Sequence, residues 1–308
     1  MARIGYLGPP GTFHEQALLS QPDLAHHDLV ALPSIPEVLA AVEARDVELG
    51  FVAIENSIDG TVNVTLDTLT FETDLLIQGE VVLNIELHLM AKPGTALGDI
   101  TRVLSFPTAT AQVRGFLGRT VPGATWEATN STSEAARLVG ESTDGGLAAV
   151  APAHAGELYG LEVLAADIAD HPENQTRFVL VRTEGVPAAT GHDKTTVVCF
   201  QRADRPGSLL TILQEFAARG INLTKLESRP TKRGLGDYCF IIDLEGHVAD
   251  EVVADCLRTL KAELADVKFL GSYPAAGAHG ESLRRDADAA WRAADEWLQQ
   301  LRSGITTT

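Results

Sequence analysis

The sequence predicts a two-lobed α/β domain followed by a small βαββαβ module. The chain has 308 residues, which is long enough for two domains of roughly 100–200 residues each. Residues 1–183 alternate short apolar runs with amphipathic stretches, a pattern typical of an α/β sheet. After residue 194 the order becomes strand, helix, strand, strand, helix, strand, which is the ferredoxin-like arrangement.

The first lobe is expected to begin with a strand at 4–7 and a turn at 8–11. Thr12 should cap the next helix, because a threonine oxygen can accept helix N–H groups. Later elements of this lobe are a helix at 35–44, a buried strand at 50–54, a polar loop at 55–60, and a helix whose buried face carries Val62, Leu66 and Leu69.

A β-rich stretch at 75–90 interrupts the alternation and is predicted to cross into a second lobe. We place the first lobe at about 1–79 with 175–183, and the second at 80–174. The predicted elements beyond the crossover are strands at 103–104, 125–128, 147–150, 161–164 and 178–181, and helices at 110–117 and 131–139. Two lobes of this kind predict a cleft between them.

Residues 184–194 have the composition of a linker. The second domain is predicted at 195–273, with strands at 197–200, 222–229, 238–244 and 267–270 and helices at 208–219 and 252–264. The tail at 274–308 is expected to hold a helix at 281–303 with one apolar stripe, which favours packing or subunit contact.

The chain is strongly acidic, with 42 Asp and Glu residues against 24 Lys and Arg residues. This argues against nucleic-acid or membrane-surface binding, since both need a basic field. An anionic substrate would have to be held by local donors. No basic-then-apolar leader and no membrane-length apolar run is present. The cysteines, Cys199, Cys239 and Cys256, lack CxxC spacing, and we interpret them as buried thiols in a cytoplasmic protein.

Polar clusters follow several predicted strands of the first domain. They are Gly8–Phe13, Glu55–Ser57, Ser105, Asn130–Thr132 and Asn174–Arg177. Strand ends of an open α/β sheet meet at one edge, so these clusters could line one site. Neutral donors dominate, and Arg177 is the obvious cation for a carboxylate. The set suits a small, oxygen-rich anion, and no metal-ligand spacing is present.

Taken singly, each cluster is more typical of an ordinary turn or helix cap. Their joint occurrence in order is what resembles the prephenate dehydratase family, from the first strand to about residue 272. The matching segments are Gly8-Pro9-Pro10-Gly11-Thr12-Phe13, Ile54-Glu55-Asn56-Ser57 with Gly60-Thr61-Val62, Glu86-Leu87-His88-Leu89, Ser105-Phe106-Pro107 with Gln112, Asn130-Ser131-Thr132 with Ala135-Ala136, Tyr159-Gly160-Leu161, and Asn174-Gln175-Thr176-Arg177-Phe178.

The resemblance implies a two-lobed, periplasmic-binding-protein-like catalytic domain. It implies a monofunctional lyase that converts prephenate to phenylpyruvate, CO2 and water without metal or organic cofactor. The implied catalytic residues are Thr176, Glu55, Asn56, Ser105 and Gln112. The implied substrate-binding residues are Thr12, Phe13, Ser57, Asn130, Ser131, Thr132, Asn174, Arg177 and Phe178. Thr176 would contact the departing hydroxyl, and Arg177 a carboxylate.

The second domain resembles the ACT regulatory module through Asp204-Arg205-Pro206-Gly207-Ser208-Leu209-Leu210 and Leu226-Glu227-Ser228-Arg229-Pro230. This implies feedback inhibition by L-phenylalanine and a homodimer or homotetramer. The implied effector-binding residues are Gly207, Ser208, Leu209, Leu210, Asn222, Glu227, Ser228, Arg229 and Pro230. Two departures from the family pattern, Phe106 and His14, affect the detail of the pocket.

Three alternatives remain open at this point. A two-lobed solute-binding protein would share the architecture of the first domain, but the lack of a leader and the second domain count against it. A non-catalytic amino-acid-sensing ACT protein is opposed by the intact run from Asn174 to Phe178. An arogenate dehydratase would use the same chemistry on a different side chain.

Overall fold

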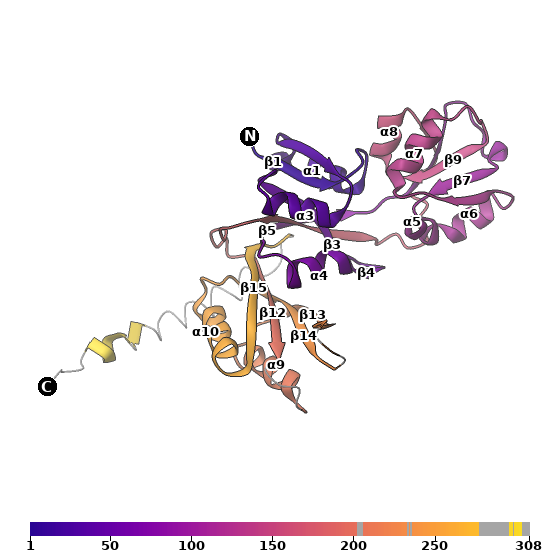
Figure 1. Cartoon of the computed structure of the whole chain (residues 1–308). Helices are drawn as coiled ribbons and strands as arrows, with labels where there is room; N and C mark the ends of the chain where they lie inside the picture. The colour runs from indigo at the N-terminus through magenta and orange to yellow at the C-terminus, as the bar shows by residue number, and fades with distance from the viewer. Residues whose placement is uncertain (202–205, 233, 235, 277–295, 298, 304–308) are drawn as a thin grey trace. The chain divides into compact units, whose positions relative to one another are not determined.

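A computed structural model describes residues 1–201, 206–232, 234, 236–276, 296–297 and 299–303. The chain divides into two compact units (Figure 1). The first comprises residues 1–68 and 81–180, and the second comprises residues 69–80 and 181–308. The boundaries fall inside three elements, α4 (Asn63–Phe71), β5 (Leu76–Asn84) and β11 (Gln175–Arg182). Residues 69–80 therefore belong to the second unit, which the sequence did not indicate.

The first sheet has the strand order β2-β1-β3-β11-β5, with β4 paired to β3. Its remaining strands are β1 (Arg3–Leu7), β2 (Asp28–Leu32), β3 (Leu49–Asn56) and β4 (Gly60–Thr61). The helices of this lobe are α1 (Phe13–Leu19), α2 (Pro22–Ala25), α3 (Ile35–Glu43) and α4. β1 runs parallel to both β2 and β3, so the ends of β1 and β3 meet at one edge of the sheet.

The second sheet has the order β10-β6-β9-β7-β8. Its strands are β6 (His88–Ala91), β7 (Arg102–Ser105), β8 (Thr125–Ala128), β9 (Leu147–Ala151) and β10 (Glu162–Ala165). Its helices are the short turn Leu97–Asp99, α5 (Pro107–Gln112), α6 (Arg114–Thr120), α7 (Thr132–Glu141) and α8 (Ala153–Tyr159). Two sheets with their own helices confirm the predicted two-lobed α/β fold (Figure 1).

Local sequence explains most helix boundaries. Ser34 and Ser131 each accept the N–H of the third helical residue through the side chain, which caps α3 and α7 as expected for serine. Thr12 is different. It stands at the N-cap of α1 without a side-chain cap, because its hydroxyl donates to the Leu7 carbonyl at 3.0 Å. The predicted capping role of Thr12 is therefore wrong.

Several elements differ from the sequence-based expectation. The helix predicted at 110–117 is two helices, because the backbone of Val113 (φ −118°, ψ 10°) leaves helical geometry. Strand β2 and helix α8 were not predicted. The predicted helix at 281–303 falls largely outside the described residues.

The second unit contains β12 (Asp193–Gln201), α9 (Ser208–Ala218), β13 (Leu223–Pro230), β14 (Tyr238–Glu245), α10 (Glu251–Thr259), a π-helical turn (Leu260–Leu264) and β15 (Ala265–Pro274). The sheet order β13-β14-β12-β15 confirms the predicted ferredoxin-like module. The three cysteines are buried and form no disulfide, and burial raises the pKa of Cys199 and of Cys256 to about 12.

Within the second unit, segment 69–80 packs on the four-stranded sheet. The Lys194 amine contacts both Glu80 carboxylate oxygens at 2.9 Å, and the Glu80 side chain is 2% exposed. Lys268 donates to the Thr70 carbonyl at 3.2 Å. A Cβ added to Gly271 would lie 2.5 Å from the Ile77 carbonyl oxygen. A buried ion pair and close backbone contact therefore hold this segment in place.

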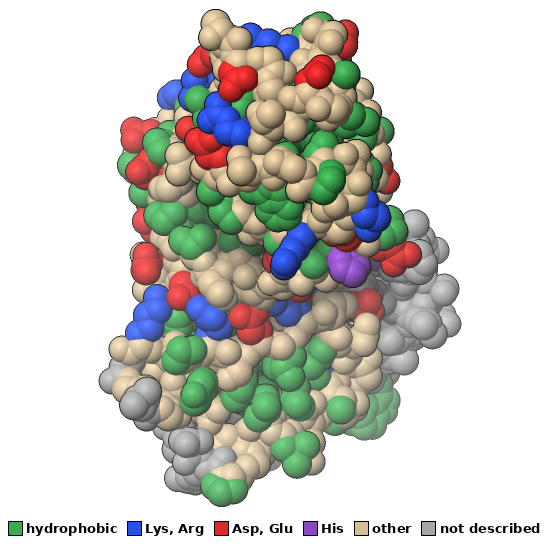
Figure 2. Space-filling view, turned by 90° about the vertical axis from the view of Figure 1, so that its right-hand side faces the viewer, with side chains coloured by type: hydrophobic (Ala, Val, Ile, Leu, Met, Phe, Trp, Pro, Cys, Tyr) green, Lys and Arg blue, Asp and Glu red, His purple; other side chains and the backbone are tan. Residues whose placement is uncertain are grey.

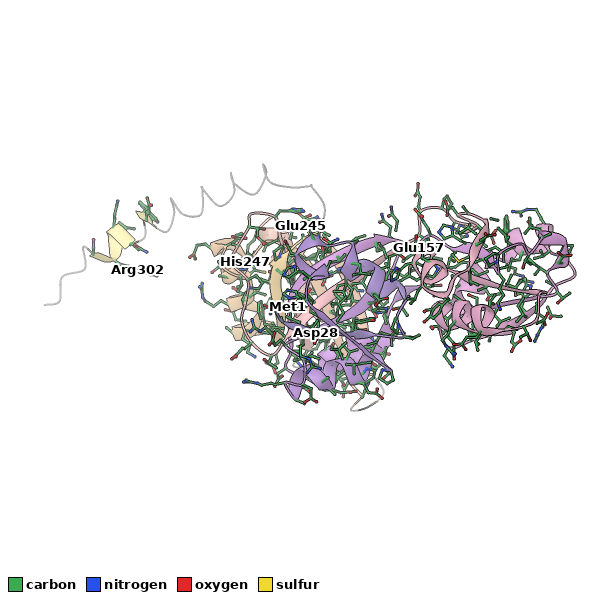
Figure 3. The ribbon with its side chains drawn as sticks, turned by 90° about the horizontal axis from the view of Figure 1, so that it is seen from above. Met1, Asp28, Glu157, Glu245, His247 and Arg302 are labelled. Atoms are coloured by element: carbon green, nitrogen blue, oxygen red, sulfur yellow. The ribbon has the colours of Figure 1, made fainter. Side chains whose placement is uncertain are left out.

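No helix in the described part of the chain is long and apolar enough to cross a bilayer. Acidic and basic side chains intermingle on the face shown in Figure 2. His247, beyond the end of β14 and labelled in Figure 3, contacts the Pro187 carbonyl through Nε2 at 3.0 Å and so fixes part of the predicted linker.

Candidate active site

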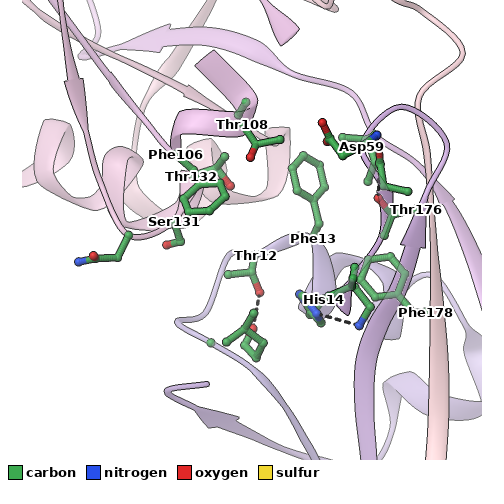
Figure 4. Close-up of a pocket in the computed structure, with 18 of the residues that line it drawn as sticks. Thr12, Phe13, His14, Asp59, Phe106, Thr108, Ser131, Thr132, Thr176 and Phe178 are labelled. Carbon is green, nitrogen blue, oxygen red and sulfur yellow. Dashed lines mark hydrogen bonds between the residues drawn. The ribbon is translucent and has the colours of Figure 1, made fainter. Parts of the chain in front are cut away.

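A cavity of about 770 Å³ opens between the two lobes of the first unit. Figure 4 shows Thr176 and Phe178 on one side, Ser131, Thr132 and Phe106 on the other, and Phe13 between them. Among the residues that line this cavity, the following were predicted from the sequence as site residues: Thr12, Phe13, Asn56, Gln112, Asn130, Ser131, Thr132, Asn174, Thr176 and Phe178. Ten of the predicted site residues, distant along the chain, therefore share one space.

Thr176 is held by the amide of Asn56. Asn56 ends β3, and its Nδ2 donates to the Thr176 hydroxyl at 2.9 Å. The Asn56 Oδ1 accepts the backbone N–H groups of Ile58 and Asp59, both at 2.9 Å, which locks the orientation of the amide. Thr176 therefore accepts from protein, and among the described residues no protein group accepts its proton.

Three further side chains continue this hydrogen-bond chain. Asn56 Nδ2 also donates to Asn174 Oδ1 at 2.7 Å, and Asn174 Nδ2 donates to Gln112 Oε1 at 3.0 Å. Gln112 Nε2 then donates to the Asp59 carboxylate at 2.7 Å. Gln112 comes from α5 of the second lobe, whereas Asn56 and Asp59 come from the first. The chain of amides consequently spans the cleft.

Glu55 and Arg177 do not line the cavity, although they were expected to serve the reaction. Side chains alternate along a strand, so Thr176 and Phe178 face the cavity while Arg177 faces away. Arg177 pairs with Glu55 at 3.3 Å, and its side chain is 11% exposed. Arg177 is therefore not among the residues that line this cavity, and its contact with a substrate carboxylate stays a prediction.

Ser57 and Ser105 are also outside the cavity lining. Ser57 donates to the Glu173 carbonyl at 3.1 Å and accepts from the Gln175 N–H at 2.9 Å, so it ties the 173–175 loop to the end of β3. The buried Ser105 donates to the Val150 carbonyl at 2.7 Å. Both hydroxyls bond to backbone groups around the site, and their predicted roles toward the substrate stay predictions.

The sequence reasoning missed three charged residues of the cavity: Asp59, Glu134 and Arg137. Arg137 is the single lysine or arginine among the described lining residues. It lies on α7, contacts Glu141 at 2.7 Å and Glu134 at 3.9 Å, and keeps 38% of its side chain exposed. The spacing gave no signal, because six residues after Ser131 are about 1.7 helical turns and do not return to the same face.

His14 forms part of the cavity wall as a neutral imidazole. Its Nε2 accepts the Ala53 backbone N–H at 3.2 Å, so its proton must reside on Nδ1. Its ring also meets the edge of Phe178 at a centroid distance of 4.9 Å. Burial lowers the pKa of His14 to about 3. Because one nitrogen accepts and the other carries the proton, His14 is not available as a base.

Residues of both lobes form hydrogen bonds that hold the loop between β1 and α1. Glu15 accepts from the Gly11 N–H at 2.6 Å and from Tyr6 at 2.9 Å, and it contacts His154 of the other lobe at 2.9 Å. Tyr159 and Ser133 both donate to the Pro10 carbonyl. Burial opposes ionisation of Glu15, but its hydrogen bonds outweigh burial and leave its pKa below the ordinary value.

The predicted effector-binding residues occupy two elements of the ACT module. Gly207 (φ 89°) is the N-cap of α9, which begins at Ser208, and Leu210 is 59% exposed on that helix. Along β13, Ser228 pairs with Phe240, whose side faces the helices, whereas Glu227 pairs with Ile241 on the other face. Glu227 and Arg229 thus lie on the face opposite α9. Asn222 accepts the Glu245 N–H at 2.9 Å through its carbonyl.

In the part of the chain that is described, no group of three or more His, Cys, Asp or Glu side chains is arranged to hold a metal ion. The polar atoms around the cavity are amides, hydroxyls and a few charges. Such a set can orient an anionic organic ligand through hydrogen bonds.

Both parts of the chain are similar to known proteins. A family model described as prephenate dehydratase matches residues 4–186, and one described as ACT domain matches residues 195–262. A prephenate dehydratase of Mycolicibacterium gilvum is 42% identical over 316 residues, covering 99% of each chain. The structure of prephenate dehydratase from Arthrobacter aurescens in complex with L-Phe has a TM-score of 0.87 and 38% identity, covering 98% of this chain and 100% of that one.

A third similar structure carries a different description. GqqA, described as a novel type of quorum quenching acylase, is 31% identical with a TM-score of 0.78, covering 92% of this chain and 99% of that one. The family model covers more than half of the chain, and the Mycolicibacterium relative matches over almost its whole length. This chain therefore belongs to the prephenate dehydratase family.

Proposed function

We propose that this chain converts prephenate to phenylpyruvate, CO2 and water, and that L-phenylalanine inhibits it. The observation that carries the proposal is the arrangement at Thr176. Its hydroxyl accepts from Asn56 inside a cavity lined by residues of both lobes, so its own proton is directed to a group that the protein does not supply. In this reaction that group is the departing hydroxyl of the substrate.

The reaction needs orientation and help for a leaving group. Aromatisation supplies the driving force, so the protein has to hold the dianion and stabilise hydroxide as it departs. A positioned hydrogen-bond donor does this in the transition state. The hydrogen bond that Thr176 accepts from Asn56 polarises its O–H and makes it a stronger donor.

The substrate carboxylates have a candidate place at the start of α7. Ser131 and Thr132 line the cavity there, and a ten-residue helix directs its first N–H groups and positive dipole end at an anion. Ser131 already accepts from the Glu134 N–H at 2.9 Å, so its own proton remains for a ligand. Arg137, on the same helix, adds positive charge at the cavity wall.

Loss of CO2 is favoured where the leaving carboxylate is poorly solvated. The cavity walls include Phe13, Phe106, Phe178, Leu87 and Val62, which offer no hydrogen bonds. A site that relies on neutral donors also avoids binding the ground-state dianion too tightly, which leaves more of the interaction for the transition state.

For regulation, we propose that L-phenylalanine binds at the ACT module beside Gly207, Ser208 and Ser228. Gly207 has a positive φ and no Cβ, so the backbone can approach a ligand, and α9 begins directly after it. The Arthrobacter relative is described in complex with L-Phe. We further propose a homodimer or homotetramer in the cytoplasm, where three free cysteines are compatible with reducing conditions.

Purified protein incubated with prephenate at neutral pH tests the activity. We expect phenylpyruvate to form far faster than in protein-free buffer, and saturating L-phenylalanine to lower the rate. Arogenate in place of prephenate decides between the two dehydratase activities, since it would yield phenylalanine directly. Absence of enzymatic phenylpyruvate formation contradicts the proposal, and an unchanged rate with L-phenylalanine contradicts the regulatory part.

The site gives no comparable support to acyl transfer. A nucleophile activated by histidine needs a ring nitrogen that can take its proton. His14, the single histidine among the described lining residues, accepts from Ala53 through Nε2 and carries its proton on Nδ1. Thr176 has no hydrogen bond to it among the described contacts.

A further inference from the structure

We propose that Asp59 is a positioning residue for the dehydration, acting through Gln112 and Asn174 on the Asn56–Thr176 pair. This role rests on the proposed function. Asp59 lies in the turn between β3 and β4, lines the cavity, and was not indicated by the sequence. Its carboxylate is the terminal acceptor of an amide chain that ends at Thr176.

The hydrogen bonds of the chain run in one direction, which the Asp59 carboxylate sets at one end and the turn after Asn56 sets at the other. An ionised carboxylate only accepts, so Gln112 must present Nε2 to it and turn Oε1 the other way. Oε1 then faces Asn174 Nδ2, at 3.0 Å, which leaves Asn174 Oδ1 to accept from Asn56, at 2.7 Å. Asn56, fixed by its own turn, requires the same orientation of Asn174, so the carboxylate and the turn hold the chain together from its two ends.

The chain is fixed at both ends. Asn56 is locked by its own turn, through the N–H groups of Ile58 and Asp59, and Gln112 is locked by the Asp59 carboxylate. Asn174, which is 1% exposed, lies between the two. Removal of the carboxylate frees Gln112 to rotate, and Asn174 then loses a fixed acceptor on that side. Asn174 is two residues from Thr176, so the loss reaches the start of β11.

The contact also joins the lobes. Gln112 ends α5, the helix that brings Phe106, Thr108 and Ala109 to the cavity wall. Asp59 therefore holds one wall of the cavity to the turn after β3, the strand that ends in Asn56. Displacement of reacting groups by about 1 Å can cost on the order of 100-fold in rate.

The charge of Asp59 allows its positioning role to be distinguished from a role in substrate binding. A negative charge in the wall repels an anionic substrate, so removal of Asp59 should not weaken substrate binding through charge. A positioning role then predicts opposite effects on the two kinetic constants. kcat falls because Thr176 is less well placed, whereas KM stays constant or falls because the repulsion has gone.

The first test is Asp59→Ala, with prephenate turnover as the assay and Asp28→Asn as the matched control. Asp28 is an exposed carboxylate on β2 that pairs with Arg3 at 3.3 Å, outside the cavity (Figure 3). We expect kcat of Asp59→Ala to fall at least tenfold with KM unchanged or lower, and the control to match wild type. A smaller fall in kcat, or a rise in KM that accompanies it, overturns the role.

The second test moves the carboxylate by one link, in Asp59→Asn combined with Gln112→Glu. A glutamate at 112 accepts from Asn174 as Gln112 does, and an asparagine at 59 can donate to it, so the direction of the chain is restored. Gln112→Glu alone places two carboxylates face to face. We expect the double variant to exceed each single variant in kcat by at least threefold. A double variant no better than the singles contradicts the proposal.

Circular dichroism and the thermal midpoint of every variant show whether the fold is retained. Asp59 is exposed in a turn, so we expect the fold to be retained.

Failure of the proposed function can be distinguished from failure of the Asp59 role. A wild-type protein without prephenate turnover overturns both the function and the role. Normal wild-type turnover with unaffected Asp59 variants overturns the role alone.

Discussion

His14 accepts the backbone N–H of Ala53 through Nε2, 39 residues away in sequence. The last residue pair between β1 and β3 joins Tyr6 and Phe51. Ala53 therefore lies beyond the shared ladder, and its N–H needs another acceptor. Its carbonyl is satisfied in the same way, by the Thr65 hydroxyl at 2.6 Å. Two side chains thus complete the hydrogen bonding of β3 at the cavity wall.

A pH dependence of stability follows from this contact. The pKa of His14 falls from 6.5 to about 3 on folding, so below pH 6.5 the unfolded chain binds a proton that the folded one excludes. The contribution of His14 to the unfolding free energy is fully present above pH 6.5 and is lost as the pH falls toward 3. We expect about 1.4 kcal/mol of lost unfolding free energy per pH unit between pH 6 and 4.

Denaturant titrations of wild type and His14→Asn across this range isolate the effect. Asparagine can accept from Ala53 but cannot titrate. Groups common to both proteins, such as Glu15, cancel in the difference. Parallel curves for the two proteins between pH 6 and 4 would show that His14 does not exclude a proton.

The Thr176 hydroxyl is expected to act on kcat more than on KM. Thr176→Val keeps the shape of the side chain but removes the donor, and we expect kcat to fall by about 100-fold or more, as for loss of one catalytic hydrogen bond. Thr176→Ser keeps the hydroxyl and should retain most of the rate. Steady-state kinetics on prephenate decides, and a Val variant with near-normal kcat rules out this contact.

Gly11 is expected to tolerate no side chain. It has φ 87°, and an added Cβ would lie 2.7 Å from Ser133 Oγ and 3.3 Å from Ala155 Cα. We expect Gly11→Ala to lower the unfolding free energy by about 1–3 kcal/mol more than Gly94→Ala. Gly94 is the matched control because it has φ 83° with no atom near the added Cβ. Equal losses in the two variants would indicate backbone strain alone.

The Lys194–Glu80 pair is expected to stabilise the second unit through mutual dependence. Glu80→Leu leaves the largely buried ammonium of Lys194 without this partner, and we expect a loss of about 3–5 kcal/mol. Lys194→Met combined with Glu80→Leu should recover most of it, because an apolar pair replaces the ions. Chemical denaturation measures both, and a double variant as unstable as the single would refute the dependence.

The sequence predicted the fold class and most of the cavity, because both depend on local patterns. Capping residues such as Ser131 and the order of the motifs could be interpreted without coordinates. The orientation of Arg177 could not, since the predicted strand began at Phe178 and β11 in fact begins at Gln175. With the strand started there, period two places Arg177 away from Thr176.

Other misses depend on contacts between distant segments. Ser105 follows a strand, as predicted, but the Val150 carbonyl of the neighbouring strand takes its hydroxyl. The position of Asp59 and Arg137 at the cavity becomes apparent only when α5 and α7 are placed opposite the first lobe. Val113 divides one predicted helix into two through its backbone conformation. A valine at this position does not signal a helix break in the sequence.

The alternation along β11 limits how this family can change length. Thr176 and Phe178 reach the cavity while Arg177 points to Glu55, so a single residue gained or lost between Asn174 and Thr176 would exchange the two sides. The guanidinium would then enter the cleft and the hydroxyl would leave it. Evolution can thus lengthen surface turns such as that at Gly94, but it must preserve the count in this strand residue by residue.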